Sequence, residues 1–298
     1  MEKFSEVISS ERLLSDQEID RILNQEIYPE HIGDVMRPRN HQSELIYIAG
    51  QPGSGKSRYE KVITEGLNLQ EPNTTIAINC DDMRDYHPRF ADLQAEDDIS
   101  AAIKINPDNA RFTDSLIDRS IEVGCNVVLE GTFRNPDSVA KTAAKYIESG
   151  YETSAIVIAT HPLISRLGII DRYLEEKELR GVGRFTYRDV HDQTISAIPK
   201  TIHKFIDNQL GSKLALISRA GEILYNTDTR GMSRSEITRT ASKAREIISA
   251  YYDRDLDDPE RHFASTCLNR NINRALKLDA PAVIIDELLG IYQMLDQR

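Results

Sequence analysis

Five short apolar runs recur along the middle of the chain. Each has four or five residues, most of them aliphatic, and turn-forming residues lie at or beside its ends. Short unbroken runs of this kind are typical of strands buried on both faces of a parallel sheet. We expect strands at residues 45–49, 76–79, 126–129, 155–159 and 214–218.

Amphipathic stretches of helical length lie between these runs. Strand–helix alternation predicts an α/β fold with a mainly parallel sheet flanked by helices. After the fifth run, Ala220-Gly221 precedes a further apolar trio at 223–225, which predicts a hairpin at one edge of the sheet. We expect helices over residues 56–67, 108–123, 137–149, 162–179, 187–209 and 234–252.

The N-terminal stretch, residues 1–44, lies outside this alternation and is acidic, with ten acids against five bases. Ser15 followed by acids predicts the N-cap of a helix whose apolar positions are Ile19, Ile22 and Leu23. We interpret the Pro and Gly residues between positions 29 and 38 as a linker into the first strand.

The C-terminal stretch begins with an acidic loop and continues as a predicted helix pair. Its last helix, residues 282–295, has Ile284, Leu288 and Ile291 on one face, which we expect to pack against another element. The predicted organisation is an N-terminal helical extension (1–44), an α/β domain (45–252) and a C-terminal helical extension (253–298).

Composition and charge narrow the choice of function. Apolar residues make up 40% and charged residues 29% of the 298, which are values of a globular protein. The net charge of −11 argues against nucleic-acid and anionic-membrane partners. Neither a secretory leader nor a membrane-spanning run is visible, and the three cysteines are far apart, so we expect a cytoplasmic protein in a reducing compartment.

The clearest chemical signal is a phosphate-binding loop directly after the first apolar run. Its eight residues satisfy the pattern G-x-x-x-x-G-K-[ST], in which backbone N–H groups and a helix N-terminus face an anion. Lys56 is expected at the β and γ phosphates of ATP, and the Ser57 hydroxyl on Mg²⁺. The predicted ATP-binding residues are Gly50, Gln51, Pro52, Gly53, Ser54, Gly55, Lys56 and Ser57.

Other positions distinguish among the proteins that carry such a loop. The sequence has no N-K-x-D string for reading a guanine base, and no apolar strand ends in an Asp of the usual magnesium-binding kind. We therefore favour a kinase with a small acceptor over a nucleotide switch. The fold expected is that of a P-loop kinase.

Asp81 follows the second predicted strand, and in an open parallel sheet ligands bind beyond the carboxyl ends of strands. A carboxylate there is a natural general base for a hydroxyl acceptor.

Asp114 shares a predicted helix face with Ala110, Ile117 and Ile121, so we expect it to be buried. Its partner is then either a structural group or a ligand hydroxyl.

Further polar residues follow the third strand, where Glu130, Thr132 and Arg134 are candidates for binding an acceptor. Residues 166–188 then hold six bases and four acids, a local reversal of the overall charge. Arg172 and Arg184 are candidates for neutralising the migrating phosphoryl group. The alternative is a solvated helix face with pairs such as Glu176 with Arg180.

Together these motifs resemble the zeta-toxin family, the kinase components of bacterial toxin–antitoxin systems. The resemblance rests on G-Q-P-G-S-G-K-S, C-D-D-M-R-D-Y-H-P-R-F, N-V-V-L-E-G-T-F-R, I-D-R-Y and G-R-F-T-Y-R-D-V-H-D, and covers roughly residues 45–230. It implies transfer of the ATP γ-phosphate to the 3′-hydroxyl of the sugar of UDP-N-acetylglucosamine, which poisons cell-wall synthesis.

The resemblance also implies roles for single residues. By motif, Lys56 and Ser57 match the ATP and magnesium residues, Asp81 the catalytic base, and Arg172 and Arg184 the phosphate-stabilising arginines. The implied substrate-binding residues are Asp114, which falls where the family usually has Glu, and Glu130, Thr132 and Arg134.

Two alternatives remain for the activity: a zeta-like kinase acting on another nucleotide or a dinucleotide, and a P-loop ATPase acting as a regulatory switch. A partner antitoxin is expected to cover the ATP site. A further hypothesis is that the acidic N-terminal helix covers that site in cis.

Overall fold

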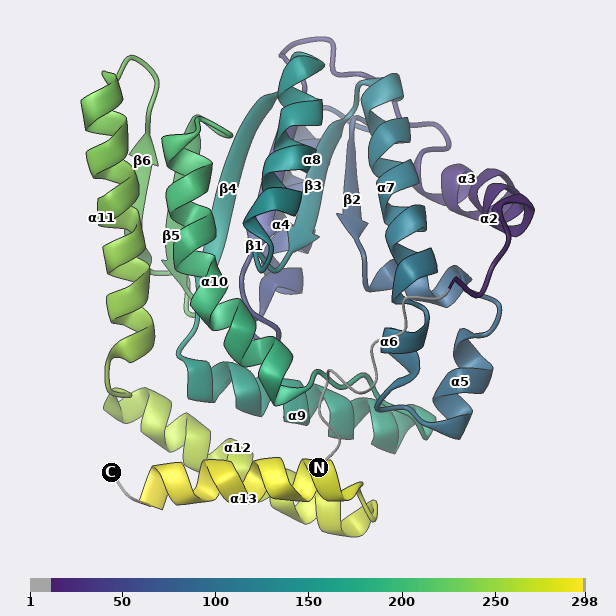
Figure 1. Cartoon of the computed structure of the whole chain (residues 1–298), viewed down its shortest axis with the longest axis vertical. Coiled ribbons are helices and arrows are strands. Elements are labelled where there is room, and N and C mark those ends of the chain that lie inside the picture. Colours follow the sequence, from purple (N-terminus) through teal and green to yellow (C-terminus); the bar gives the residue numbers. More distant parts are fainter. Residues whose placement is uncertain (1–11, 297–298) are drawn as a thin grey trace.

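The computed structural model describes residues 12–296, and a six-stranded sheet forms its centre (Figure 1). The strand order is β2-β3-β1-β4-β5-β6; the first five strands are parallel, and β6 is antiparallel to β5. The strands are β1 (Glu44–Ala49), β2 (Thr75–Asn79), β3 (Asn126–Gly131), β4 (Glu152–Ala159), β5 (Lys213–Ser218) and β6 (Ile223–Asp228).

The sheet is buried on both faces because its central strands are apolar on both sides of the pleat. Leu45 and Tyr47 of β1 enter the larger core, whereas Ile48 enters a smaller one. On the larger-core side lie α7 (Asn106–Val123), α8 (Pro136–Glu148), α10 (Arg188–Asp207) and α11 (Arg234–Asp253). The opposite face is covered by α4 (Lys56–Gln70).

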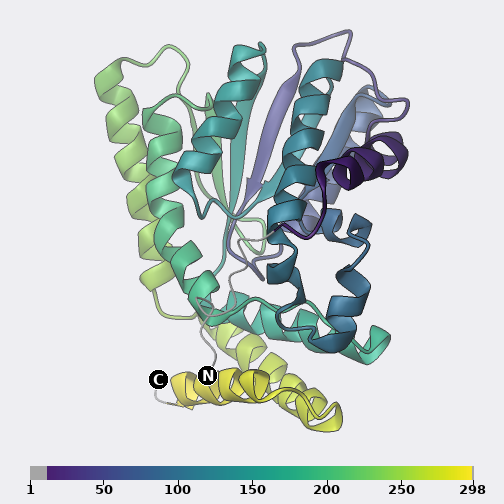
Figure 2. The same ribbon diagram turned by 45° about the vertical axis from the view of Figure 1, so that its right-hand side comes forward.

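A third group of elements lies at the carboxyl ends of the strands. There α9 (Pro162–Arg180) crosses beneath the sheet, and the C-terminal hairpin of α12 (Asp258–Lys277) and α13 (Ala282–Asp296) packs on its far side (Figures 1 and 2). Three short helices complete this end: η2 (Asp82–Tyr86), α5 (Phe90–Glu96) and α6 (Ala101–Lys104).

The predicted α/β architecture is confirmed, and the five strands, the edge hairpin and the terminal helix pair lie where the apolar pattern placed them. Boundaries differ by a few residues; β4, for example, begins at Glu152 rather than at 155. The short helices η2, α5 and α6 were not predicted, since segments of four to seven residues contain too few turns to show a period.

The N-terminal helix begins as predicted, with Ser15 and Glu18 forming a capping box. It continues as α2 (Asp16–Ile22), the π-helical η1 (Leu23–Ile27) and α3 (Tyr28–His31). The expectation that the linker begins at Pro29 is therefore wrong by three residues. Pro29 lies two residues after the π-helical turn and does not end the helix.

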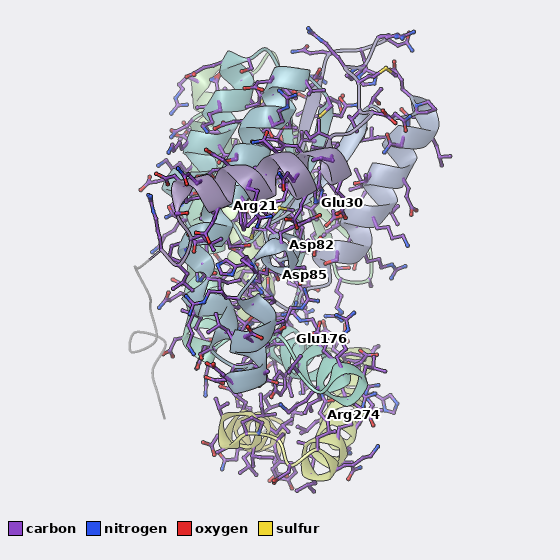
Figure 3. All side chains as sticks on the ribbon, turned by 90° about the vertical axis from the view of Figure 1, so that its right-hand side faces the viewer. Arg21, Glu30, Asp82, Asp85, Glu176 and Arg274 are labelled. Atoms are coloured by element: carbon purple, nitrogen blue, oxygen red, sulfur yellow. The ribbon has the colours of Figure 1, made fainter. Side chains whose placement is uncertain are left out.

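This helix packs on α7 at the β2 side of the sheet, where Ile22 and Ile27 enter the larger core (Figure 1). Figure 3 shows Glu30 on this helix, with Asp82 and Asp85 of η2 below it. None of residues 12–34 lines the cleft at the phosphate loop. The hypothesis that the acidic helix covers the ATP site is thus wrong for residues 12–34, because their apolar face is used in the core; residues 1–11 lie outside the described part.

Within residues 12–296, no helix combines the length and the apolar character that crossing a membrane requires.

Candidate functional site at the phosphate loop

The phosphate loop depends on glycine for close packing as well as for its backbone conformation. Gly53 has a φ of 76°, and a Cβ there would lie 2.0 Å from the Ser165 carbonyl oxygen of α9. A Cβ on Gly168, one turn further along α9, would lie 2.7 Å from the carbonyl oxygen of Gly53. Both contacts exclude any larger residue, so the loop and α9 lie backbone against backbone.

Gln51 holds the loop from within. Its side chain is fully buried and donates to the Thr160 carbonyl and the Ser165 hydroxyl. Its amide oxygen accepts a hydrogen bond of 3.1 Å from the hydroxyl of Tyr252 at the end of α11. The loop pattern accepts any residue at position 51, yet the Gln51 side chain connects the loop to the end of β4, to α9 and to α11.

Lys56, Ser57 and Glu130 meet at the start of α4. The Ser57 hydroxyl donates to Glu130 Oε2 at 2.9 Å, and Lys56 Nζ lies 3.8 Å from Glu130 Oε1. Burial lowers the pKa of Lys56, although the Glu130 charge opposes this. The helix N-terminus, the ammonium group and the hydroxyl together provide positive charge and donors for a polyphosphate.

Asp81 lies just beyond β2, as predicted. Its backbone N–H donates to Asn79 Oδ1 at 2.9 Å, and its carboxylate receives Arg84 Nη2 at 2.6 Å. Burial alone would raise the pKa of Asp81, but the charges of Arg84, Arg172 and Arg184 outweigh it and hold the pKa below its usual range. This carboxylate is therefore ionised at neutral pH and able to accept a proton.

The two predicted arginines approach Asp81 differently. Arg184 is aligned by Glu176, whose carboxylate accepts both Nη2 at 2.7 Å and the Arg184 backbone N–H at 2.8 Å. The expected pair of Glu176 with Arg180 is not formed; Glu176 binds Arg184 instead. Arg172 extends from α9, and its buried Nε has no hydrogen-bond partner.

In the turn after β3, Phe133 is buried, and the predicted residues on either side of it face the cleft. Phe133 has a φ of 52° and packs its ring between Tyr47 and Phe205, while Thr201 donates to its carbonyl oxygen at 2.8 Å. A non-glycine residue in this conformation is unusual and is held by its surroundings. Thr132 and Arg134, on either side, line the cleft.

These residues surround a cleft of about 500 Å³. A second hollow of about 530 Å³ shares Asp81, Glu130 and Arg172 with it and adds Glu60, Asp82 and Arg184. Burial and the Glu130 charge raise the pKa of Glu60 to about 7. The lining of the first cleft includes, among the predicted residues, Pro52, Gly53, Gly55, Lys56, Ser57, Asp81, Glu130, Thr132, Arg134 and Arg172.

The prediction that Asp114 is buried is wrong, because its side chain is exposed and it lines neither hollow. Phe112 and Leu116 define the buried face of α7, together with Ile117. At about 100° per residue, Asp114 is roughly 200° from Phe112 and points away from that face. Of the apolar positions used for the prediction, Ile117 is buried, but Ala110 is exposed and does not mark the buried face.

The carboxylate buried in α7 is that of Asp108. It accepts the backbone N–H groups of residues 13–14 at 2.8 and 3.2 Å, and His87 Nε2 lies 3.4 Å from it. The next residue, Asn109, donates to the carbonyl oxygen of Cys80 at 2.6 Å. The loop that carries the predicted base is thus fixed to α7 and, through Asp108, to the N-terminal segment.

Sequence reasoning missed several residues of the cleft. Arg84 could have been predicted from the sequence, because a residue three positions after Asp81 on a helical turn lies on the same side of the helix as Asp81. Gly168 and Arg219 carried no local signal, because α9 and the end of β5 reach the phosphate loop only through the fold. Asp171 stands in the quoted motif I-D-R-Y but was given no role.

The sequence profile of the zeta-toxin family, described as Zeta toxin, matches residues 29–230, which is more than half of the chain. The chain belongs to the zeta-toxin family. It is 30% identical to Toxin zeta of Enterococcus hirae over 191 residues, 63% of this chain and 65% of that protein. Toxin PezT of Streptococcus pneumoniae is 23% identical over 197 residues, 66% of this chain and 76% of that protein. The match thus spans slightly less than two thirds of the length of the Enterococcus toxin.

Solved structures agree with this zeta-toxin fold. The structure titled as the PezAT chromosomal toxin–antitoxin system of Streptococcus pneumoniae has a TM-score of 0.69 at 20% identity, covering 90% of this chain and 99% of that one. A complex titled AvrRxo1-ORF1:-ORF2 with ATP has a TM-score of 0.53 at 13% identity, covering 93% and 87%. These similarities establish the fold.

Proposed function

We propose that this zeta-toxin family member is an ATP-dependent kinase that phosphorylates a hydroxyl group of a small acceptor, the 3′-hydroxyl of the sugar of UDP-N-acetylglucosamine. One observation carries the proposal: the ionised Asp81 and Lys56 of the phosphate loop line the same cleft. A phosphoryl group bound at Lys56 and a hydroxyl at Asp81 would then face each other.

Each group of residues at the cleft has a proposed role in the transfer. Lys56 and the loop N–H groups hold the β and γ phosphates, Asp81 orients the acceptor hydroxyl and takes its proton, and Arg172 and Arg184 neutralise the charge of the migrating group. Glu130 is positioned to bind acceptor hydroxyls as well as Ser57. Thr132 and Arg134 line the cleft and complete the substrate residues on this side, whereas Asp114, the remaining predicted substrate residue, lines neither hollow.

The residues also fit Mg²⁺. Within the described residues, no group of three or more His, Cys, Asp or Glu side chains forms a metal site. Magnesium in kinases is usually held by one or two protein oxygens together with phosphates and water, and Ser57 and Glu130 provide such oxygens. Held by Ser57 and Glu130, the ion would supply positive charge that neutralises the phosphates of the donor.

The test is mass spectrometry after incubation with ATP, Mg²⁺ and a panel of UDP-sugars, other nucleotides and dinucleotides. We expect UDP-N-acetylglucosamine to gain one phosphoryl group, about 80 daltons, and Asp81→Asn to abolish the gain while ATP still binds. A gain on a dinucleotide alone would identify the other acceptor class. ATP hydrolysis without any phosphorylated acceptor would instead indicate the regulatory switch and contradict the kinase proposal.

We also propose an antitoxin partner that covers the ATP site. The titles of the similar structures support this, since PezAT is a toxin–antitoxin system and AvrRxo1-ORF1 is in complex with ORF2. Co-expression with a neighbouring open reading frame and co-purification would test it. Deletion of residues 1–11 alone tests the remaining form of the cis hypothesis, which requires the deletion to raise kinase activity.

A further inference from the structure

We propose that Phe263 of the C-terminal hairpin and Arg219 after β5 form the surface on which the base of the donor nucleotide stacks. This inference rests on the proposed function for the identity of the donor. It assigns a binding role to an extension that the family profile, which ends at residue 230, does not reach.

The order of the strands indicates on which side of the phosphate loop the sugar and base of the donor nucleotide lie. Asp81 follows β2 and Glu130 lies in β3, so the acceptor side of the cleft is on one side of β1 and its phosphate loop. In phosphoryl transfer the attacking and leaving oxygens lie roughly in line, on opposite sides of the phosphorus. The remainder of the donor must therefore extend toward β4 and β5.

Arg219 lies on that side and is fixed in place. Its Nη1 donates to the Gly53 carbonyl oxygen of the phosphate loop at 2.7 Å, and the residue lines the cleft. Its guanidinium carbon is 5.9 Å from the centroid of the Phe263 ring. The planar Arg219 guanidinium, held by the phosphate loop, therefore lies at the end of the cleft where we expect the base of the donor.

Phe263 provides an aromatic ring beside the Arg219 guanidinium. The residue is 43% exposed and lies beside Arg219 of the cleft lining, outside that lining itself. Phe185 lines the cleft, but its ring already packs edge-on between Tyr173 and Tyr187. Aromatic rings and arginine planes both stack on nucleobases, and Phe263 with Arg219 supplies one of each.

The hairpin is anchored to the same wall of the cleft by a second contact. Asp171 of α9, which lines the cleft beside Gly168, accepts Arg270 Nη2 of α12 at 2.8 Å. Cys267, which lies between Phe263 and Arg270 along α12, is buried, and its Sγ accepts Arg270 Nη2 at 3.6 Å. The position of Phe263 is therefore set by α9, the helix that also packs on the phosphate loop.

The test compares binding of ATP with binding of inorganic tripolyphosphate, which has no base, by titration calorimetry on the full chain. We expect Phe263→Ala to weaken ATP binding about five- to hundredfold and to leave tripolyphosphate binding unchanged. Phe263→Tyr, which keeps the ring, should bind ATP like the unmodified protein. Tyr292→Ala, which removes a 52% exposed ring from α13, is the matched control and should bind both ligands normally.

Unchanged ATP binding in Phe263→Ala, or equal loss for ATP and tripolyphosphate, would overturn the inference; the second result would indicate a structural effect on the phosphate loop. The experiment needs no acceptor. If no acceptor is phosphorylated by the unmodified protein, the kinase proposal fails while the ATP-specific loss still decides the role of Phe263.

Discussion

Gly168 lies in the interior of α9, where glycine ordinarily weakens a helix, yet a Cβ there would approach the Gly53 carbonyl oxygen to 2.7 Å. Overpacking typically costs about 1–3 kcal/mol, which corresponds to about a five- to hundredfold change in a dissociation constant. We therefore expect Gly168→Ala to displace the phosphate loop and to weaken ATP binding by that factor. The measurement is the ATP dissociation constant.

Gly66 is the matched control, because it lies inside α4 and a Cβ there would meet nothing within 4 Å. Gly66→Ala should leave ATP binding unchanged and stabilise the fold by about 0.5–1 kcal/mol. Similar ATP dissociation constants for the two variants would show that the contact between Gly53 and Gly168 does not shape the loop.

Arg84 was missed in the sequence but makes the closest charged contact of Asp81. Removing it by Arg84→Gln should raise the pKa of Asp81, because a favourable charge beside the carboxylate is lost. The acid limb of the kcat/KM profile should then move to higher pH. Arg89→Gln, at an exposed position of the same segment, should leave the profile unchanged; an unshifted limb in Arg84→Gln would argue against Asp81 as the base.

At the scale of elements, the N-terminal helix is part of the core rather than a detachable arm. Ile27 is fully buried, so Ile27→Ala should lower the free energy of unfolding by about 2–5 kcal/mol. Leu69→Ala removes an 85% exposed side chain and should change it by less than about 0.5 kcal/mol. Urea denaturation measures both, and a small effect of Ile27→Ala would mean that the helix is dispensable.

The elements that the sequence predicted best are those whose signal is local. The phosphate loop, the apolar strands and the Ser15 cap each depend on neighbouring residues. Asp114 was misplaced because the elements that pack on α7 determine which of its faces is buried, and that face holds Phe112 and Leu116. The contacts of Arg219 and Phe263 join segments whose proximity follows only from the order of the strands.

At the scale of the whole molecule, three histidines bear on the pH dependence of stability. His87 and His191 are buried and His31 is partly so, and burial lowers the pKa of each below the ordinary value of about 6.5. The folded protein therefore binds fewer protons than the unfolded chain just below that pH. The three histidines should make stability fall as the pH decreases from about 6.5, against a smaller opposite contribution from Glu60, whose raised pKa of about 7 lets the folded protein bind a proton there.

Urea unfolding at pH 7.5 and pH 5.5 measures this difference. His191→Gln should reduce the loss between the two pH values, since His191 contacts Ser165 and Asp192 inside the fold and no longer titrates in the variant. Equal stability at both pH values in the unmodified protein would contradict the expectation.

The hydrogen bond from Tyr252 to Gln51 spans 201 residues of sequence. At about 5–20 residues per second, synthesis of that interval takes roughly 10–40 s. A nascent chain thus carries its phosphate loop long before the group that secures it has been made. For a member of a toxin family, this delay separates translation of the nucleotide-binding motif from completion of the site, and fragments ending before Tyr252 would lack the finished loop.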